Sequence, residues 1–430
     1  MLNYKNRILA LFIIAALLSV SFTVVHAQDE CNFEGEPIRI GATGPLSAPG
    51  TVLAGIDMQW AFNIAEADLN APPNCGIELD GVQHPVEVIF GDTEGLPERG
   101  AAVADRLINE NGVVALTGEY HSAVGLSMMD VAVEANIPTV FSETFSDQIT
   151  AQQAPNTFRI APTSTIASSA ISEWLISLEP EDVVIIAENT DFGTGIAEST
   201  QANLEAAGVN VEVIFVELGT QDFLPILSRI QAGDPPDAIH TTGVTGETNL
   251  NLVQQMAELG LAPTEDTICI ANQVAITPEF WETVPDGNYC VFRKIGLGPA
   301  SYNEIAQSLA DRYNETFGSA AQSWVFESYD SLFIIADAIE RAGSTDPDAV
   351  IEALEATDIT LAQGRYYFPF GLNNPVPEDV PEWMWHQWPD PAVTVLQYFE
   401  EGQSGDEAAI LWPEVRQTHG TSYIVPGTTP

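Results

Sequence analysis

The sequence has few basic residues. Its 430 residues include 13 lysines and arginines against 61 aspartates and glutamates, and its formal net charge is −48 at neutral pH. A surface this acidic repels nucleic acid and anionic lipid, so the charge excludes a protein that binds either one through its general surface. The charge fits adaptation to salty surroundings, recruitment of cationic ligands, or a self-repelling surface that keeps the protein in solution.

Long apolar runs are absent beyond the N-terminus. There, Lys5 and Arg7 precede an apolar core at residues 8–20, and a site of small residues ends at Ala27. This order is typical of a secretory signal peptide, and the core is shorter than the roughly 20 apolar residues that span a bilayer. An uncleaved membrane anchor is the alternative. We predict that residues 1–27 are cleaved after Ala27 and that the protein is periplasmic or extracellular.

Cysteine is also scarce. The four cysteines form an even set in a compartment that is expected to be oxidising. We expect Cys31 to pair with Cys75, because they precede the first and second predicted strands, and Cys269 to pair with Cys290, because they lie in consecutive short apolar runs. Sequence alone permits three pairings, and free buried thiols are the remaining alternative.

The common signatures of enzymes are missing. The sequence contains no G-x-S-x-G elbow, no G-x-x-x-x-G-K-[ST] phosphate loop and no H-E-x-x-H zinc motif. The six histidines are scattered, and none forms a pair with helical metal-ligand spacing. His121 and Ser122 could suggest a catalytic base and its nucleophile, but adjacent loop residues seldom face each other, so the pair gives little support for catalysis. We expect no catalysis, no metal site and no cofactor.

Strand and helix patterns alternate along most of the chain. The predicted strands are residues 38–42, 86–90, 113–117, 138–141, 183–187, 211–216, 238–241 and 267–271. The helices predicted between them include 97–110, 122–135, 195–207, 223–231 and 247–259. This α/β order favours parallel sheets that hold ligands at the carboxyl ends of their strands. The order restarts near residue 182, and about 400 residues exceed one core, so two lobes are expected.

The last part of the chain is predicted to be mainly helical. Helices are expected near residues 301–315, 324–341 and 346–356, and residues 382–388 with 393–398 suggest a hairpin. Trp383, Trp385 and Trp388 in that segment are interpreted as core packing, with a wall that stacks on a ligand as the alternative.

Polar and small residues follow successive predicted strands in both halves. The candidates are Ser47, His121, Ser122, Ser142, Thr144, Phe192, Thr245, Asn272 and Gln273. Hydroxyls, amides and helix N-termini suit a small anionic or zwitterionic solute. Each residue alone is as readily a helix cap, as Ser122 would be before its helix. Their convergence in two halves predicts a binding cleft.

Six sequence regions run in order over nearly all of the chain after the predicted signal peptide. They are IRIG with GPL at 38–46, GD at 91–92, ANIP at 135–138, DFGTG at 191–195, QQMAELGL at 254–261 and ESYDSL at 327–332. This ordered set resembles the type I periplasmic solute-binding proteins of ABC importers, in particular the leucine/isoleucine/valine-binding protein family.

The resemblance implies two Rossmann-like lobes joined by three crossover strands, with a solute trapped in the cleft between them. The crossovers are expected near residues 159–162, 293–298 and 363–366. The N-terminal lobe would then comprise residues 36–159 and 298–362, and the C-terminal lobe residues 160–297 and 363–425. The implied protein is a monomer that delivers an amino acid or similar solute to a membrane ABC permease. A sensory ligand-binding domain of the same fold is the alternative.

The resemblance also assigns roles to single residues. Ser122 matches the serine that binds an amino-acid carboxylate, and Ser142 and Thr144 match the segment that binds the ammonium and carboxylate. Phe192 stands where the family has a tyrosine over the ligand. Trp324 stands where the family has an aromatic residue near the side chain of the ligand.

Two departures affect the expected solute. Asn272, or its neighbour Gln273, occupies the position at which the family has an acidic residue that binds the ammonium group. Thr245 occupies the position of a second tyrosine. A neutral partner weakens the bond to an ammonium group. An amide or a carboxylate is therefore as well suited as a branched-chain amino acid. Ser47, in the glycine-rich loop, would be a secondary contact.

Overall fold

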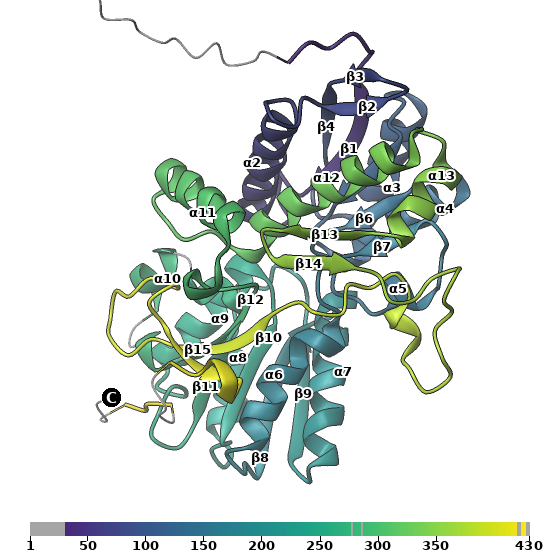
Figure 1. Cartoon of the computed structure of the whole chain (residues 1–430). Helices are drawn as coiled ribbons and strands as arrows, with labels where there is room; N and C mark the ends of the chain where they lie inside the picture. The colour runs from purple at the N-terminus through teal and green to yellow at the C-terminus, as the bar shows by residue number, and fades with distance from the viewer. Residues whose placement is uncertain (1–30, 277, 285–286, 419–422, 427–430) are drawn as a thin grey trace, which may run out of the picture.

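The chain forms two α/β lobes, each built around its own sheet (Figure 1). The computed structural model describes residues 31–276, 278–284, 287–418 and 423–426. The predicted signal peptide lies outside these residues. Within them, no helix has both the length and the apolar character needed to cross a bilayer.

The sheet of the first lobe has the order β4-β1-β5-β6-β7, and all its neighbours are parallel. Its strands are β1 (Ile38–Gly44), β4 (Val86–Asp92), β5 (Ala115–Gly118), β6 (Thr139–Phe141) and β7 (Thr157–Arg159). Helices α2 (Val52–Leu69), α3 (Pro97–Asn109) and α4 (Ser122–Glu134) connect them. Because the strands are parallel, the loops after β5 and β6 meet at one edge of the sheet.

The sheet of the second lobe has the order β16-β15-β12-β11-β10-β8-β9. Its parallel strands are β8 (Asp182–Glu188), β9 (Asn210–Val216), β10 (Ala238–Gly243), β11 (Ile268–Ala271) and β12 (Val291–Ile295). The antiparallel edge strands are β15 (Val393–Gln397) and β16 (Ala409–Trp412). The helices are α6 (Ser164–Ile176), α7 (Asp191–Ala206), α8 (Leu224–Gln231), α9 (Gly246–Glu258) and α10 (Pro278–Thr283). The expected α/β class with two sheets is therefore confirmed.

The remaining elements mostly complete the first lobe. They are the hairpin β2 (Ile77–Leu79) and β3 (Val82–His84), α5 (Gln148–Ala151), α11 (Glu304–Phe317), α12 (Ser323–Ala342), α13 (Pro347–Glu355), β13 (Asp358–Leu361) and β14 (Gly364–Tyr367). Helix α12 packs along α2 and is buried around most of its circumference. It forms the centre of the first lobe's core.

The chain crosses between the lobes three times, and the last crossing lies later than expected. The first two crossings follow Arg159 and Ile295. After β14 the chain stays with the first lobe, because Tyr366 and Trp388 pack in its core and the Trp388 N–H donates to the carbonyl of Arg159 at 2.9 Å. The third crossing therefore follows Trp388, and residues 363–388 belong to the first lobe.

The predicted hairpin of residues 382–388 with 393–398 is wrong. Residues 382–384 form a turn of 3-10 helix, and β15 pairs with β12 on one side and β16 on the other. Trp385 and Trp388 are buried, and Trp388 belongs to the first lobe's core.

Both predicted disulfides are confirmed. Cys31 is bonded to Cys75 with their Cα atoms 5.2 Å apart, and Cys269 to Cys290 with their Cα atoms 4.7 Å apart. The Cys31–Cys75 bond links the segment before β1 to the segment between α2 and β2 of the first lobe. The second lies inside the core of the second lobe, where both cysteines are fully buried.

Removing the buried disulfide is expected to destabilise the protein more than removing the peripheral one. Cys269→Ala with Cys290→Ala should lower the free energy of unfolding by about 5 kcal/mol, of which about 3 kcal/mol is chain entropy of the unfolded state and the rest is lost core packing. Cys31→Ala with Cys75→Ala, at partly exposed positions, is the matched control. Urea unfolding followed by tryptophan fluorescence measures both. An equal or smaller loss for the first variant would contradict the structural account.

Candidate functional site

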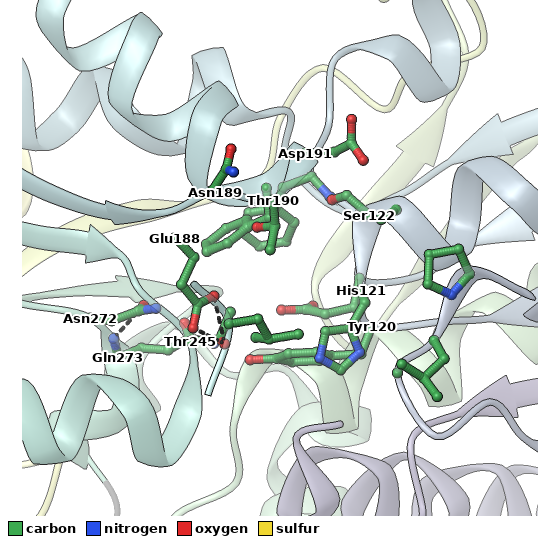
Figure 2. Close-up of a pocket in the computed structure, with 18 of the residues that line it drawn as sticks. Tyr120, His121, Ser122, Glu188, Asn189, Thr190, Asp191, Thr245, Asn272 and Gln273 are labelled. Carbon is green, nitrogen blue, oxygen red and sulfur yellow. Dashed lines mark hydrogen bonds between the residues drawn. The ribbon is translucent and has the colours of Figure 1, made fainter. Parts of the chain in front are cut away.

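A cavity of about 250 Å³ lies between the two lobes at the carboxyl ends of their strands. The first lobe contributes Tyr120, His121, Ser122, Glu143 and Phe145, and the second contributes Glu188, Phe192, Thr245, Asn272, Gln273 and Arg293. In Figure 2, Glu188 and Thr245 face Tyr120 and His121 across the cavity. Its volume is below the roughly 300–1,000 Å³ of sites for drug-sized molecules, so it suits a small solute.

The lobes touch around this cavity. The rings of Phe145 and Phe192 meet edge to face with their centres 5.8 Å apart. On another side, Gln273 Nε2 donates to Ser323 Oγ at 3.4 Å. These contacts join residues of opposite lobes, so they describe a conformation in which the lobes have come together over the site.

The N-terminus of α4 forms one wall on the first lobe. Ser122 is the first residue of α4, and its Oγ accepts hydrogen bonds from the N–H groups of Phe145 and Ser146, each at 3.0 Å. Its hydroxyl hydrogen remains available as a donor. The backbone N–H groups of the first turn also carry the positive end of the helix dipole, which favours an anionic group in the cavity.

Phe192 reaches the cavity because the chain turns tightly after β8. The Thr190 side chain caps α7 by accepting from the Gly193 N–H at 3.1 Å. A Cβ atom at Gly193 would overlap the carbonyl oxygen of Glu188, so only glycine allows the helix to start this close to the strand. The motif DFGTG therefore places an aromatic ring beside the cavity.

Glu188 is the acidic group on the second lobe's side. Its carboxyl is buried at the end of β8, and the Thr245 hydroxyl is 2.9 Å and 3.1 Å from its two oxygens. Burial raises the pKa of Glu188 to about 7, although the hydrogen bonds from Thr245 lower it. Glu188 can therefore accept a hydrogen bond when ionised and donate one when protonated.

Asn272 and Gln273 line the cavity with amides that are already engaged. Asn272 Nδ2 donates to the Val244 carbonyl at 2.9 Å, and its Oδ1 accepts from the Gln273 N–H at 2.7 Å. Gln273 Oε1 accepts from the Ile295 N–H at 3.3 Å. An acidic side chain does line this side of the cavity, but it is Glu188, on a different strand.

Arg293 on β12 places a buried guanidinium at the cavity. Its side chain is only 1% exposed, and one nitrogen, Nη2, donates to Asn272 Oδ1 at 3.3 Å. Nε and Nη1 have no hydrogen-bond partner among the described residues. Burial lowers the pKa of Arg293 to about 10, and the nearby Glu143 carboxyl opposes that shift. Arg293 therefore remains charged near neutral pH.

Glu143 and Glu327 form a buried carboxyl pair beside Arg293. Both side chains are at most 4% exposed, and they hydrogen bond to each other. Two carboxyl groups in such contact cannot both be ionised, so at least one proton is held between them. Burial and the neighbouring Glu143 raise the pKa of Glu327 well above its usual value. Glu327 is thus the proton donor of the pair.

Four predicted site residues lie elsewhere. Ser47 is exposed and donates to Asp92 Oδ2 at 2.6 Å, while Ser142 and Thr144 are buried behind the cavity wall. Trp324 donates to Asp57 Oδ2 at 2.9 Å and lines a neighbouring cavity of about 60 Å³, which shares Tyr120, Asn272 and Gln273 with the first.

The predicted site residues leave out several charged and aromatic groups of the cavity, among them Phe145, Glu143, Glu188 and Arg293. Glu143 and Glu188 each stand at the end of a predicted strand, and that position was a usable signal. Arg293 offered a signal as well, since it is one of only 13 basic residues and lies in an apolar run.

Known proteins of similar sequence and structure are solute-binding proteins. An amino acid binding protein of Pseudomonas aeruginosa is 23% identical over 367 residues, which cover 84% of this chain and 91% of that protein. The branched-chain amino acid transporter substrate-binding protein LivJ of Streptococcus pneumoniae, solved with isoleucine, has a TM-score of 0.72 at 20% identity, covering 88% of this chain and 100% of LivJ.

A third similar protein holds a different kind of solute. The solute-binding protein of an ABC transporter from Rhodopseudomonas palustris, solved with 3,4-dihydroxybenzoic acid, has a TM-score of 0.69 at 18% identity, covering 84% of this chain and 93% of that one. The family model described as periplasmic binding protein matches residues 37–371, well over half of the sequence. The chain therefore belongs to the periplasmic binding protein family.

Proposed function

We propose that this protein captures a small polar solute between its lobes outside the cytoplasm and delivers it to the membrane permease of an ABC importer. The observation that carries this proposal is the cavity itself, which is walled by residues of both lobes and lies where the lobes meet. A solute held there contacts both lobes at once, so its binding energy favours the closed arrangement.

The solute class follows from the polar groups of the cavity. The N-terminus of α4 and Arg293 suit a carboxylate, and Glu188 suits an ammonium or hydroxyl group. Phe145 and Phe192 supply apolar surface for the rest of the molecule. An amino acid, branched or not, or a related amide or carboxylate fits this set, and relatives that were solved with isoleucine and dihydroxybenzoic acid span the same range.

The proposal also specifies binding without chemical change and a monomeric protein. The cavity presents recognition groups, and its serine is not paired with a base, because Ser122 Oγ accepts hydrogen bonds from two backbone N–H groups. Turnover of a bound solute would contradict the proposal.

Delivery is tested with a reconstituted permease. Stimulated uptake of the solute would support delivery, and no stimulation with any permease of the host would favour a sensory role.

A thermal-shift panel of amino acids, amides and carboxylates tests solute capture. A solute at about 100 times its dissociation constant should add roughly 2.7 kcal/mol to the free energy of unfolding. Ser122→Ala and Phe192→Ala together should weaken a hit at least tenfold, about 1.4 kcal/mol, because they remove a donor and an aromatic wall. An unchanged affinity in this double variant would show that the solute binds elsewhere. Ser47→Ala, outside the cavity, is the control.

Glu188 should make the stability of the empty protein depend on pH. Because burial raises the pKa of Glu188 from 4.5 to about 7 in the folded protein, its contribution is fully present below the unfolded pKa and is lost as the pH rises through about 7. Over that range wild type should lose stability relative to Glu188→Gln by up to about 1.4 kcal/mol per pH unit.

Urea unfolding at several pH values measures this difference, in which the other titrating carboxyl groups cancel. Glu198→Gln, at an exposed position of α7, controls for the removal of one negative charge. Parallel stability curves for wild type and Glu188→Gln would show that Glu188 is not buried as described.

A further inference from the structure

Arg293 is an unusual basic residue in this protein because it is buried and incompletely partnered. Seven of the described basic side chains form ion pairs with aspartate or glutamate. Arg293 has no carboxylate within 4.0 Å among the described residues, and its Nε and Nη1 have no hydrogen-bond acceptor. Leaving charged donors buried and unpaired is costly. An acceptor that arrives with the solute would remove that cost.

The surroundings of Arg293 favour a carboxylate as that acceptor. A guanidinium group offers parallel N–H donors that match the two oxygens of a carboxylate. Its Cζ atom lies 5.8 Å from the centre of the Phe145 ring, which packs against Phe192. A solute with a carboxylate at Arg293 would therefore place its apolar part against aromatic surface.

Glu143 complicates such binding. Its carboxyl lies close enough to Arg293 to act as part of its counter-charge, and it hydrogen bonds to Glu327 on α12. A second carboxylate brought to Arg293 would be repelled by an ionised Glu143 in surroundings of low polarity. Proton uptake at Glu143 would relieve this repulsion, and the charge of Arg293 would then be balanced by the solute.

We propose that Arg293 is the anchor for a carboxylate of the solute, and that the Glu143–Glu327 pair takes up one proton when this carboxylate binds. The proposal deepens the proposed function and rests on it. The protein and the solute anion combine with one proton from the solvent, and that proton joins the Glu143 carboxylate. Glu327 already carries the other proton of the pair, so both carboxyl groups become neutral.

Two other ionisable groups, Tyr120 and Asp330, lie near the pair. Tyr120 faces Glu143 and stays neutral, because burial raises its pKa above the usual value. Asp330 lies one turn beyond Glu327 on α12 and accepts from the N–H groups of Ala362 and Gln363, each at 3.0 Å. These groups are fixed in the folded lobe. Among the carboxyl groups Glu143, Glu327 and Asp330, Glu143 is the one that lines the cavity, although burial also raises the pKa of Asp330 to about 7.

The coupling has a definite sign. Burial raises the pKa of Glu143 to about 7 in the empty site, while the hydrogen bond from Glu327 and the charge of Arg293 lower it. A carboxylate bound at Arg293 raises the pKa of Glu143 further. The affinity is therefore constant below about pH 7, falls by up to about tenfold per pH unit above it, and becomes constant again above the pKa of the bound state.

The first experiment compares carboxylates with their amides by titration calorimetry on the full mature chain. The probes are benzoate and benzamide, isovalerate and isovaleramide, and L-leucine and L-leucinamide. The tightest of the six should be a carboxylate that exceeds its amide by roughly 10- to 100-fold, the effect of one charge-assisted hydrogen-bonded pair. Arg293→Gln should remove this preference. Lys294→Gln, whose side chain pairs with Asp406 at 2.9 Å, should keep it.

The second experiment counts protons. The tightest carboxylate is titrated in phosphate and in Tris, whose ionisation enthalpies differ, between about pH 6 and pH 8.5. Uptake should rise from near zero to as much as one proton per bound carboxylate as the pH passes about 7. Because Glu188 also lines the cavity and has its pKa raised to about 7, the comparison is made in a Glu188→Gln background. There, Glu143→Gln should abolish the uptake and the pH dependence while leaving the carboxylate preference in place. This variant keeps the guanidinium, so it separates proton coupling from a general loss of folding.

Each result decides part of the proposal. If an amide binds as tightly as its carboxylate, or if Arg293→Gln keeps the preference, the anchor assignment is overturned. If the carboxylate binds without proton uptake, or if Glu143→Gln in the Glu188→Gln background takes up the same number of protons as that background alone, the coupling is overturned. If none of the six probes binds, the carboxylate class is overturned, while the proposed function survives with any other solute found by thermal shift.

Discussion

The arrangement of the cavity depends on a second buried arginine, Arg159, at the first crossing between the lobes. Its guanidinium donates to Gln387 Oε1 at 2.6 Å, to Thr150 Oγ1 at 2.8 Å and to the carbonyl oxygens of Thr144 and Ser146. A fully buried charge is tolerated only when its donors are satisfied. The loop that carries Glu143 and Phe145 is therefore fastened to the crossing strand, and residues 363–388 are fastened to the same lobe through Gln387.

Arg159 and Arg293 are both almost completely buried, but they differ in how many of their N–H donors have a partner in the protein. Every nitrogen of the Arg159 guanidinium donates to a group of the protein. The acceptors are Ser146 in the loop after β6, Thr150 in α5, and Gln387 shortly before the third crossing. Arg293 donates one hydrogen bond to Asn272, and its Nε and Nη1 have no partner among the described residues. The Arg159 guanidinium is thus fully engaged in holding the first crossing together, whereas the Arg293 guanidinium, near the second, keeps donors for the proposed carboxylate.

The sequence predicted the alternating strands, the two sheets and both disulfides because their signals are local: apolar runs, helix stop signals and cysteine spacing. It missed α6, in which small residues such as Ser168 and Ser172 are buried, so no polar face contrasts with an apolar one. The third crossing was placed too early because that segment is held to the first lobe by tertiary contacts, namely the packing of Tyr366 and Trp388 and the hydrogen bond between Arg159 and Gln387. Such contacts leave no local signal in the sequence. In the cavity, Ser122, Phe192 and Thr245 follow strands directly and were found. Glu143 and Glu188 also follow strands, but among 61 acidic residues nothing in the sequence marks these two as buried.

The same acidity has different consequences at the surface and in the cavity. Surface carboxylates are solvated and their field decays over about 8 Å at physiological salt, so they impede an anion mainly during approach. Inside the cavity, water is excluded and a single guanidinium acts at short range, where charges interact strongly. Because Glu143 and Glu327 share a proton, the two carboxyl groups nearest Arg293 contribute at most one negative charge between them. The protein can therefore be strongly anionic as a whole and still present a local site for a carboxylate.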